Sequence, residues 1–152
     1  MKNWLRRVLA ITLCIFTLCA TAACKAPKSA SAAYGLSQFE QDMKAAHYSF
    51  TVKNSDRFFL PAAQKRMAIG KDSLIIYIFS SAAIMQKTAK GINSDGYIYS
   101  DGDKSVCVDY FMDPHLHFFK KGSIIVEYAG VNKKLLVDLN KLLGAQFAGE
   151  ES

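Results

Sequence analysis

The segment SLIIYIF, at residues 73–79, constrains the fold more than any other stretch of the chain. Its residues are apolar on both faces of an extended strand, whereas a strand with one face in water alternates apolar and polar residues. Such a strand is stable only inside a sheet that has other elements packed on both faces. We therefore expect residues 73–79 to form the central strand and Ile76 to be among the most buried residues.

The rest of the chain after residue 36 alternates helix and strand patterns. Ser37 and Glu40 have the spacing of a capping box at the start of the first helix. The order predicts an α+β fold over residues 36–149, with a single antiparallel sheet of five or six strands and helices packed on it. The predicted helices are 37–46, 81–90 and 132–143, and the predicted strands are 48–53, 64–69, 73–79, 96–100, 104–112 and 123–129.

Two segments of this domain have similar patterns. KDSLIIYIFSSAAIMQKTAK, from Lys71, and KGSIIVEYAGVNKKLLVDLN, from Lys121, both contain an apolar strand, a turn and an amphipathic helix. This similarity is compatible with a duplicated strand-strand-helix unit. Two unrelated units that share the same secondary structure would show the same pattern, and we favour that interpretation.

The first 23 residues have the layout of a secretory signal peptide. Lys2, Arg6 and Arg7 form a basic start, residues 8–23 carry no charge, and small residues lead into Cys24. An uncleaved membrane anchor is the alternative, but the apolar run is at the lower limit of the length that spans a bilayer. The sequence therefore predicts an exported chain whose signal peptide is removed.

Cys24 and the residues after it indicate how the mature chain is anchored to a membrane. A cysteine directly after small residues resembles the lipobox of bacterial lipoproteins, in which the thiol is diacylated and becomes residue one; Thr21 stands where Leu is usual. The alternative is ordinary cleavage after the A-x-A patterns at 20–22 or 30–32. Residues 24–35, rich in Ser, Ala, Pro and Lys, then form a flexible tether. Lipidation at Cys24 would anchor the chain to the membrane, since two acyl chains suffice for stable anchoring.

Charge and cysteine content limit the classes of function. The formal net charge is +6, and the basic pairs at 65–66, 120–121 and 133–134 are spread along the chain. We interpret these pairs as solvated residues, with contact to anionic lipid head groups as the alternative. Nucleic-acid binding is not indicated, because it requires clustered basic residues. Removal of the signal and lipidation of Cys24 leave Cys107 without a disulfide partner, and we expect it to be a small buried core residue.

One cluster has the composition of a metal site. Asp113, His115 and His117 in DPHLH offer one oxygen and two nitrogen ligands, and an H-x-H pair on a strand would place both imidazoles on one face. Pro114 argues for a loop, so we interpret both histidines as polar loop residues and predict neither a metal site nor any other cofactor.

Two other clusters fail the requirements of their chemistry. A nucleophilic thiolate needs a nearby cation, helix start or positioned histidine that lowers the pKa of the thiol, and the sequence around Cys107 indicates none of these. No catalytic motif appears elsewhere. Four residues at the ends of a predicted hairpin lack the spacing of a calcium loop, so we assign them to turns. They are Asn93, Asp95, Asp101 and Asp103.

The segments at 95–130 and 142–149 are similar to a group of small uncharacterised bacterial lipoproteins. These share a D-G-[FY] strand start, a P-H-F-[FY]-K-K-G turn, an I-I-V-x-Y-x-G strand and a G-x-Q-F-A-G tail. This chain departs from the turn pattern, because Leu116 and His117 are interposed after His115. The resemblance implies a location at the bacterial membrane and gives no substrate, cofactor or catalytic residue.

The sequence therefore predicts a membrane-anchored envelope lipoprotein, with its domain on the extracytoplasmic side. Its expected role is non-catalytic: it binds or supports another envelope component. One alternative is a metal-dependent or thiol hydrolase of the envelope that uses His115, His117 and Cys107. The other is a small solute-capturing lipoprotein, although the domain is small for a two-lobed clamp.

Overall fold

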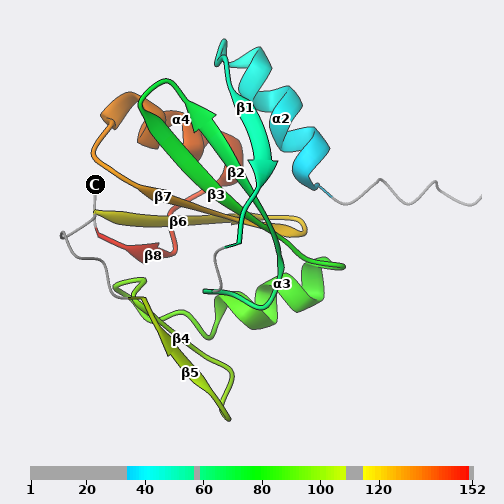
Figure 1. Cartoon of the computed structure of the whole chain (residues 1–152), viewed down its shortest axis with the longest axis vertical. Coiled ribbons are helices and arrows are strands. Elements are labelled where there is room, and N and C mark those ends of the chain that lie inside the picture. Colours follow the sequence, from blue (N-terminus) through cyan, green and yellow to red (C-terminus); the bar gives the residue numbers. More distant parts are fainter. Residues whose placement is uncertain (1–33, 57–58, 109–114, 151–152) are drawn as a thin grey trace, which may run out of the picture. The chain divides into compact units, whose positions relative to one another are not determined.

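Strand β3 (Asp72–Ile78) is the central strand that the sequence predicts, third of six in an antiparallel sheet. The computed structural model describes residues 34–56, 59–108 and 115–150, all within a unit that spans Ala32–Ser152. The sheet runs in the order β1-β2-β3-β7-β6-β8, and a separate hairpin pairs β4 with β5, so the fold is α+β as expected (Figure 1). The other elements are α2 (Leu36–Ala45), α3 (Ala82–Ala89), α4 (Lys133–Leu143), β1 (Thr51–Asn54), β2 (Ala63–Ile69), β4 (Ile98–Ser100), β5 (Ser105–Cys107), β6 (Leu116–Lys121), β7 (Ile124–Ala129) and β8 (Ala148–Gly149).

Both faces of the sheet are covered, as the two-sided apolar pattern of β3 requires. On the first face α2 and α4 pack on the sheet, and Ile76 is fully buried in the same cluster as Leu135 and Leu139. On the second face α3 packs on β3, β6 and β7, together with two further segments, one around Phe59 and one around Tyr99. Both clusters lie wholly within the unit, which therefore has the core that an independently folding domain needs.

The helix boundaries are close to those predicted, but one cap differs. Ser81 and Asn132 cap α3 and α4, each accepting a hydrogen bond from a backbone N–H in the first turn. The prediction of a capping box at Ser37 and Glu40 is wrong. Helix α2 begins at Leu36, one residue before the predicted start, with Gly35 as its N-cap and no side-chain cap. Within the described residues, no helix has both the length and the apolar character needed to cross a bilayer.

The sequence analysis missed two strands, the short β8 and the longer β6. Pro114 suggested a loop there, but the six residues from Leu116 pair with β7 along their whole length, and two of them also pair with β8. In contrast, the strand predicted at 104–112 is shorter in the structure, since β5 ends at Cys107 and residues 109–114 lie outside the described part. The hairpin of β4 and β5 projects from the rest of the domain (Figure 1).

The two halves with similar sequence patterns meet at the centre of the sheet. Ile76 on β3 lies directly opposite Val126 on β7. In a duplicated unit, a two-fold axis perpendicular to the sheet would exchange β3 and β7. This rotation does not interchange the two faces of the sheet, so α3 and α4 would lie on the same face. They pack on opposite faces, α3 through Met85 and α4 through Leu139. The structure thus does not support a duplicated strand-strand-helix unit.

Candidate functional site

A pocket beside α4 is the hollow that combines apolar walls with titratable side chains. Its volume is about 350 Å³, at the lower end of the range of about 300 to 1,000 Å³ that is typical of small-molecule sites. The walls come from the start of β6, the turn between β7 and α4, the outer side of α4 and the residue after β8. The lining residues are His115, His117, Val131, Lys133, Leu136, Val137, Asn140 and Glu150.

His117 forms the floor of the pocket and is buried, not a loop residue as the sequence analysis expected. Its Nδ1 lies 2.8 Å from Gln146 Oε1 and its Nε2 lies 3.1 Å from the carbonyl oxygen of Gly130. The ring also stacks on Tyr128. Both nitrogens of His117 are therefore engaged within the fold, which leaves neither of them directed at a metal ion.

His115 stands at the rim of the same pocket. Its Nδ1 is paired with Glu150 Oε2, and about half of each side chain is exposed. His115 and His117 do share one side of the β6 segment, as the H-x-H pattern predicts, but Asp113 lies outside the described residues. No group of three or more metal-ligating side chains occurs in the described part of the chain.

The apolar wall of the pocket is unusually exposed. Val131 and Val137 are 64% and 52% accessible, while Leu136 between them is buried. Burial of apolar surface contributes a favourable free energy of about 25 cal/mol per Å². A ligand that covered Val131 and Val137 would therefore gain binding free energy from the valine surface that it removes from water.

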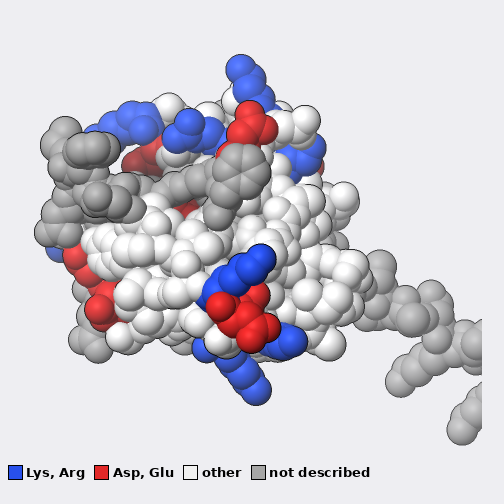
Figure 2. All heavy atoms as spheres, turned by 60° about the horizontal axis from the view of Figure 1, so that its bottom comes forward, with Lys and Arg blue, Asp and Glu red and all other residues white. Residues whose placement is uncertain are grey.

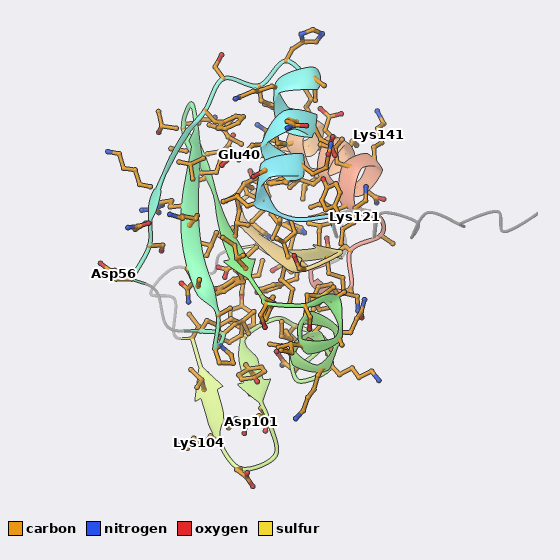
Figure 3. All side chains as sticks on the ribbon, turned by 90° about the vertical axis from the view of Figure 1, so that its right-hand side faces the viewer. Glu40, Asp56, Asp101, Lys104, Lys121 and Lys141 are labelled. Carbon is orange, nitrogen blue, oxygen red and sulfur yellow. The ribbon has the colours of Figure 1, made fainter. Side chains whose placement is uncertain are left out.

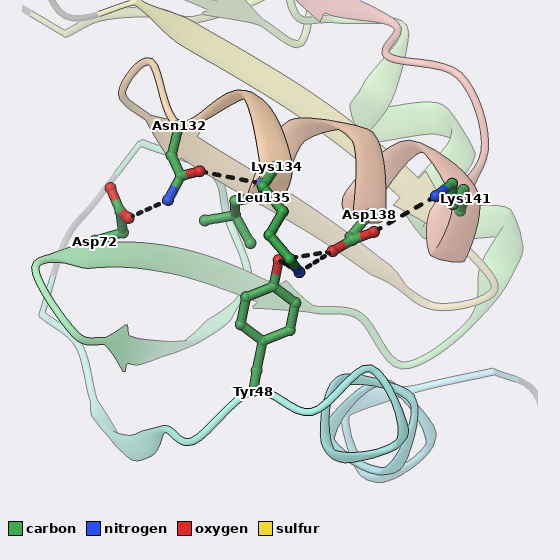
Figure 4. A network of polar contacts seen from close by, with 7 residues as sticks. All are labelled: Tyr48, Asp72, Asn132, Lys134, Leu135, Asp138 and Lys141. Carbon is green, nitrogen blue, oxygen red and sulfur yellow. Dashed lines mark hydrogen bonds and ion pairs between the residues drawn. The ribbon is translucent and has the colours of Figure 1, made fainter.

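The start of α4 is fixed by a polar network. Asn132 accepts a hydrogen bond from Leu135 N and donates one to Asp72 (Figure 4). Further along α4, Asp138 accepts hydrogen bonds from Lys134, one helical turn before it, and from Tyr48. These two bonds lower the pKa of the Asp138 carboxyl. Burial is the main cause that raises the pKa of Tyr48. This network joins α4 to β3 and to the segment before β1, which holds one wall of the pocket in place.

A second polar pair lies on the other face of the sheet. Tyr77 Oη donates a 2.6 Å hydrogen bond to Glu127 Oε2, and both residues are buried. A carboxylate at this depth persists because it is hydrogen-bonded. Since almost none of Glu127 reaches solvent, this pair is not placed to act on a substrate, and we interpret it as part of the core.

The remaining candidates from the sequence do not join the pocket. Cys107 is exposed on β5, so the expectation of a buried core thiol is wrong; β5 belongs to the projecting hairpin and not to the main sheet. Asp101 Oδ1 accepts hydrogen bonds from the backbone of Lys104 and Asp103, which lower the pKa of its carboxyl, as expected for a turn residue. Cys24 lies outside the described residues.

The hairpin tip carries charges of both signs. Asp101 and Lys104 stand near its end (Figure 3), and in the view of Figure 2 basic and acidic side chains lie close together, with further basic side chains along the upper edge.

Four pocket residues were not singled out from the sequence: Val131, Val137, Asn140 and Glu150. Glu150 reaches His115 because β8 pairs with β6, whereas the other three are brought there by α4 and the turn before it. A partial signal was present, since the two segments that carry the family resemblance meet here, with Gln146 from the second contacting His117 from the first. No protein-family model matches the chain, and neither a curated protein nor a solved structure shows significant similarity to it.

Proposed function

We propose that this chain is an exported lipoprotein, anchored through Cys24, whose domain binds a ligand without transforming it. The signal-like residues 1–23, the cysteine after them and the Ser- and Ala-rich residues up to 35 support the anchor. The extracytoplasmic side of a bacterial membrane is the location that such an anchor gives. The domain would then act at the membrane surface, where it captures a solute or supports another envelope component.

The pocket beside α4 is the observation that supports binding. Its apolar wall is exposed, and its polar groups stand at the rim, where Lys133 adds a positive charge and Asn140 an amide. Side chains of this kind suit a small amphipathic molecule with an apolar body and a carboxylate or similar polar group. His117 and the His115–Glu150 pair are engaged with protein atoms, so their role in this proposal is to shape the site.

The proposal is tested by methyl NMR of a chain from Ala32 to Ser152, titrated with hexanoate, benzoate and indole. We expect saturable shifts of the methyl signals of Val131, Leu136 and Val137 with at least one probe. Val137→Asp should weaken that binding by about tenfold or more, because a carboxylate in the apolar wall must be desolvated when the ligand binds.

Ile84→Asp is the matched control. Ile84 is 48% exposed on α3, on the other face of the sheet, so the same change there leaves probe binding unchanged. If no probe perturbs the three methyl groups, or if Ile84→Asp weakens binding as much as Val137→Asp, the pocket is not the ligand site.

A further inference from the structure

A second hollow lies on the sheet itself, at the end where β2 turns into β3. It has a volume of about 410 Å³ and is lined by residues of β1, β2 and β3 together with the turn. On β3 the buried residues of the second core cluster begin at Ile75, and Lys53, Arg66 and Ala68, which line the hollow, are exposed. The lining residues are Thr51, Lys53, Arg66, Ala68, Gly70, Lys71, Asp72 and Ser73.

Two basic side chains face each other across this surface. Lys53 on β1 is the direct register partner of Arg66 on β2, and both are exposed. Like charges directly opposite each other on neighbouring strands destabilise a sheet, whereas opposite charges stabilise it. Lys71, in the turn, brings a third positive charge to the same hollow.

One acidic side chain, Asp72, lies among the described lining residues and offsets only part of these charges. Its carboxylate accepts hydrogen bonds from two neutral donors on the α4 side of the sheet, Tyr128 Oη to Oδ1 and Asn132 Nδ2 to Oδ2; the bond from Asn132 is drawn in Figure 4. Arg66 Nη2 makes only a long contact of 3.4 Å with the hydroxyl of Ser73. The hollow therefore combines three cations and two hydroxyl groups with one carboxylate whose oxygens are engaged on the α4 side, which leaves a net positive charge.

The consecutive residues Lys65 and Arg66 of β2 do not form one basic patch. Lys65 donates a 2.6 Å hydrogen bond to Asn54 Oδ1, while Arg66 enters the hollow. Neighbouring residues of a strand point to opposite faces, so the pair is not one basic patch. The cationic surface is instead assembled from three separate segments, which the sequence pattern does not show.

We propose that this hollow binds the phosphate group of a small soluble molecule. A phosphate carries close to two negative charges near neutral pH, and its oxygens accept from guanidinium, ammonium and hydroxyl groups alike. It matches three cations better than a single carboxylate does, and a hollow of 410 Å³ admits a small molecule. This site is separate from the pocket beside α4 and does not depend on the lipid anchor.

The test measures the melting temperature of the Ala32–Ser152 chain in increasing pyrophosphate, with sodium chloride at equal ionic strength as the reference. A ligand that binds only the folded state raises the melting temperature in a saturable way. We expect such a rise, and we expect Lys53→Gln combined with Arg66→Gln to weaken the apparent affinity by about tenfold or more. Without pyrophosphate the same variant should melt at the same or a higher temperature, because the repulsion is gone.

Lys87→Gln with Lys90→Gln is the control, since it removes the same charge from exposed positions at the end of α3. It should leave the pyrophosphate response intact. The proposal fails if pyrophosphate gives no saturable rise beyond sodium chloride, or if the control variant loses the response equally. It also fails if the hollow residues are needed only for binding to phosphatidylglycerol vesicles, which would assign the surface to lipid head groups.

Discussion

At the scale of single residues, Tyr128 links more parts of the molecule than its position in β7 suggests. Its hydroxyl donates to Asp72 Oδ1 at 2.9 Å and accepts from Asn132 N at 3.0 Å, and its ring stacks on His117. Gly130 must be a glycine here, because a Cβ atom would lie 2.5 Å from the Tyr128 hydroxyl. One buried phenol thus joins the start of α4, the first residue of β3 and the floor of the pocket.

Tyr128→Phe should therefore lower the free energy of unfolding at pH 7 by about 1 to 3 kcal/mol, since Asp72 and Asn132 each lose a partner. Burial is the main cause that raises the pKa of Tyr128 from 10.0 to about 12. The folded state holds this proton more tightly than the unfolded state, so its contribution is complete below pH 10 and is lost as the pH rises through 12. Denaturant unfolding between pH 7 and 12 should show a shallower alkaline loss in Tyr128→Phe; an identical pH dependence in both proteins would contradict the assignment.

At the scale of elements, β8 is short but closes the pocket. Its two residues pair with β6, and Glu150 N donates to the carbonyl oxygen of Leu116, which places the Glu150 carboxylate next to His115. Gly149 has a φ of +97°, and a Cβ atom there would lie 1.9 Å from the carbonyl oxygen of Leu116. A side chain at this position is excluded both by the backbone conformation and by space.

Gly149→Ala should consequently detach β8 from β6 while leaving the central strands paired. Hydrogen exchange measured by NMR should show loss of protection at the amides of Phe147 and Glu150, which donate to the carbonyl oxygens of Phe118 and Leu116 on β6, with protection retained at Ile76. The pocket would lose the wall that Glu150 provides, so probe binding at Val137 should weaken. Retained protection at Phe147 and Glu150 would show that β8 tolerates the substitution and is not held as described.

The sequence predicts the central elements well because their signals are local. The two-sided apolar run of β3 and the leucine face of α4 each determine burial without reference to distant residues, and Ile76 and Leu139 are both fully buried as a result. Strand β6 has no such signal, since Pro114 and His115 precede it and His117 interrupts its apolar residues. Without β6 the pocket cannot be predicted, because the contact between His115 and Glu150 depends on two strand pairings and not on spacing.

At the scale of the whole molecule, the domain has two cores. The domain from residue 34 to 150 has a buried cluster on each face of its sheet, so it can hold its fold without a disulfide. The two proposed binding sites lie at different places on the sheet, one beside α4 and one at the turn between β2 and β3. A domain of this kind on a flexible tether would present both sites to solutes at the membrane surface.

Anchoring through Cys24 is the central claim, because it sets where the domain acts. Intact-mass analysis of the membrane fraction tests it most directly. The account predicts a mature chain that begins at Cys24 and carries two or three acyl chains, and it predicts that Cys24→Ala blocks this processing. A soluble mature chain that begins at Ala23 or Ala33, with an unmodified thiol at Cys24 where that residue is retained, would contradict it.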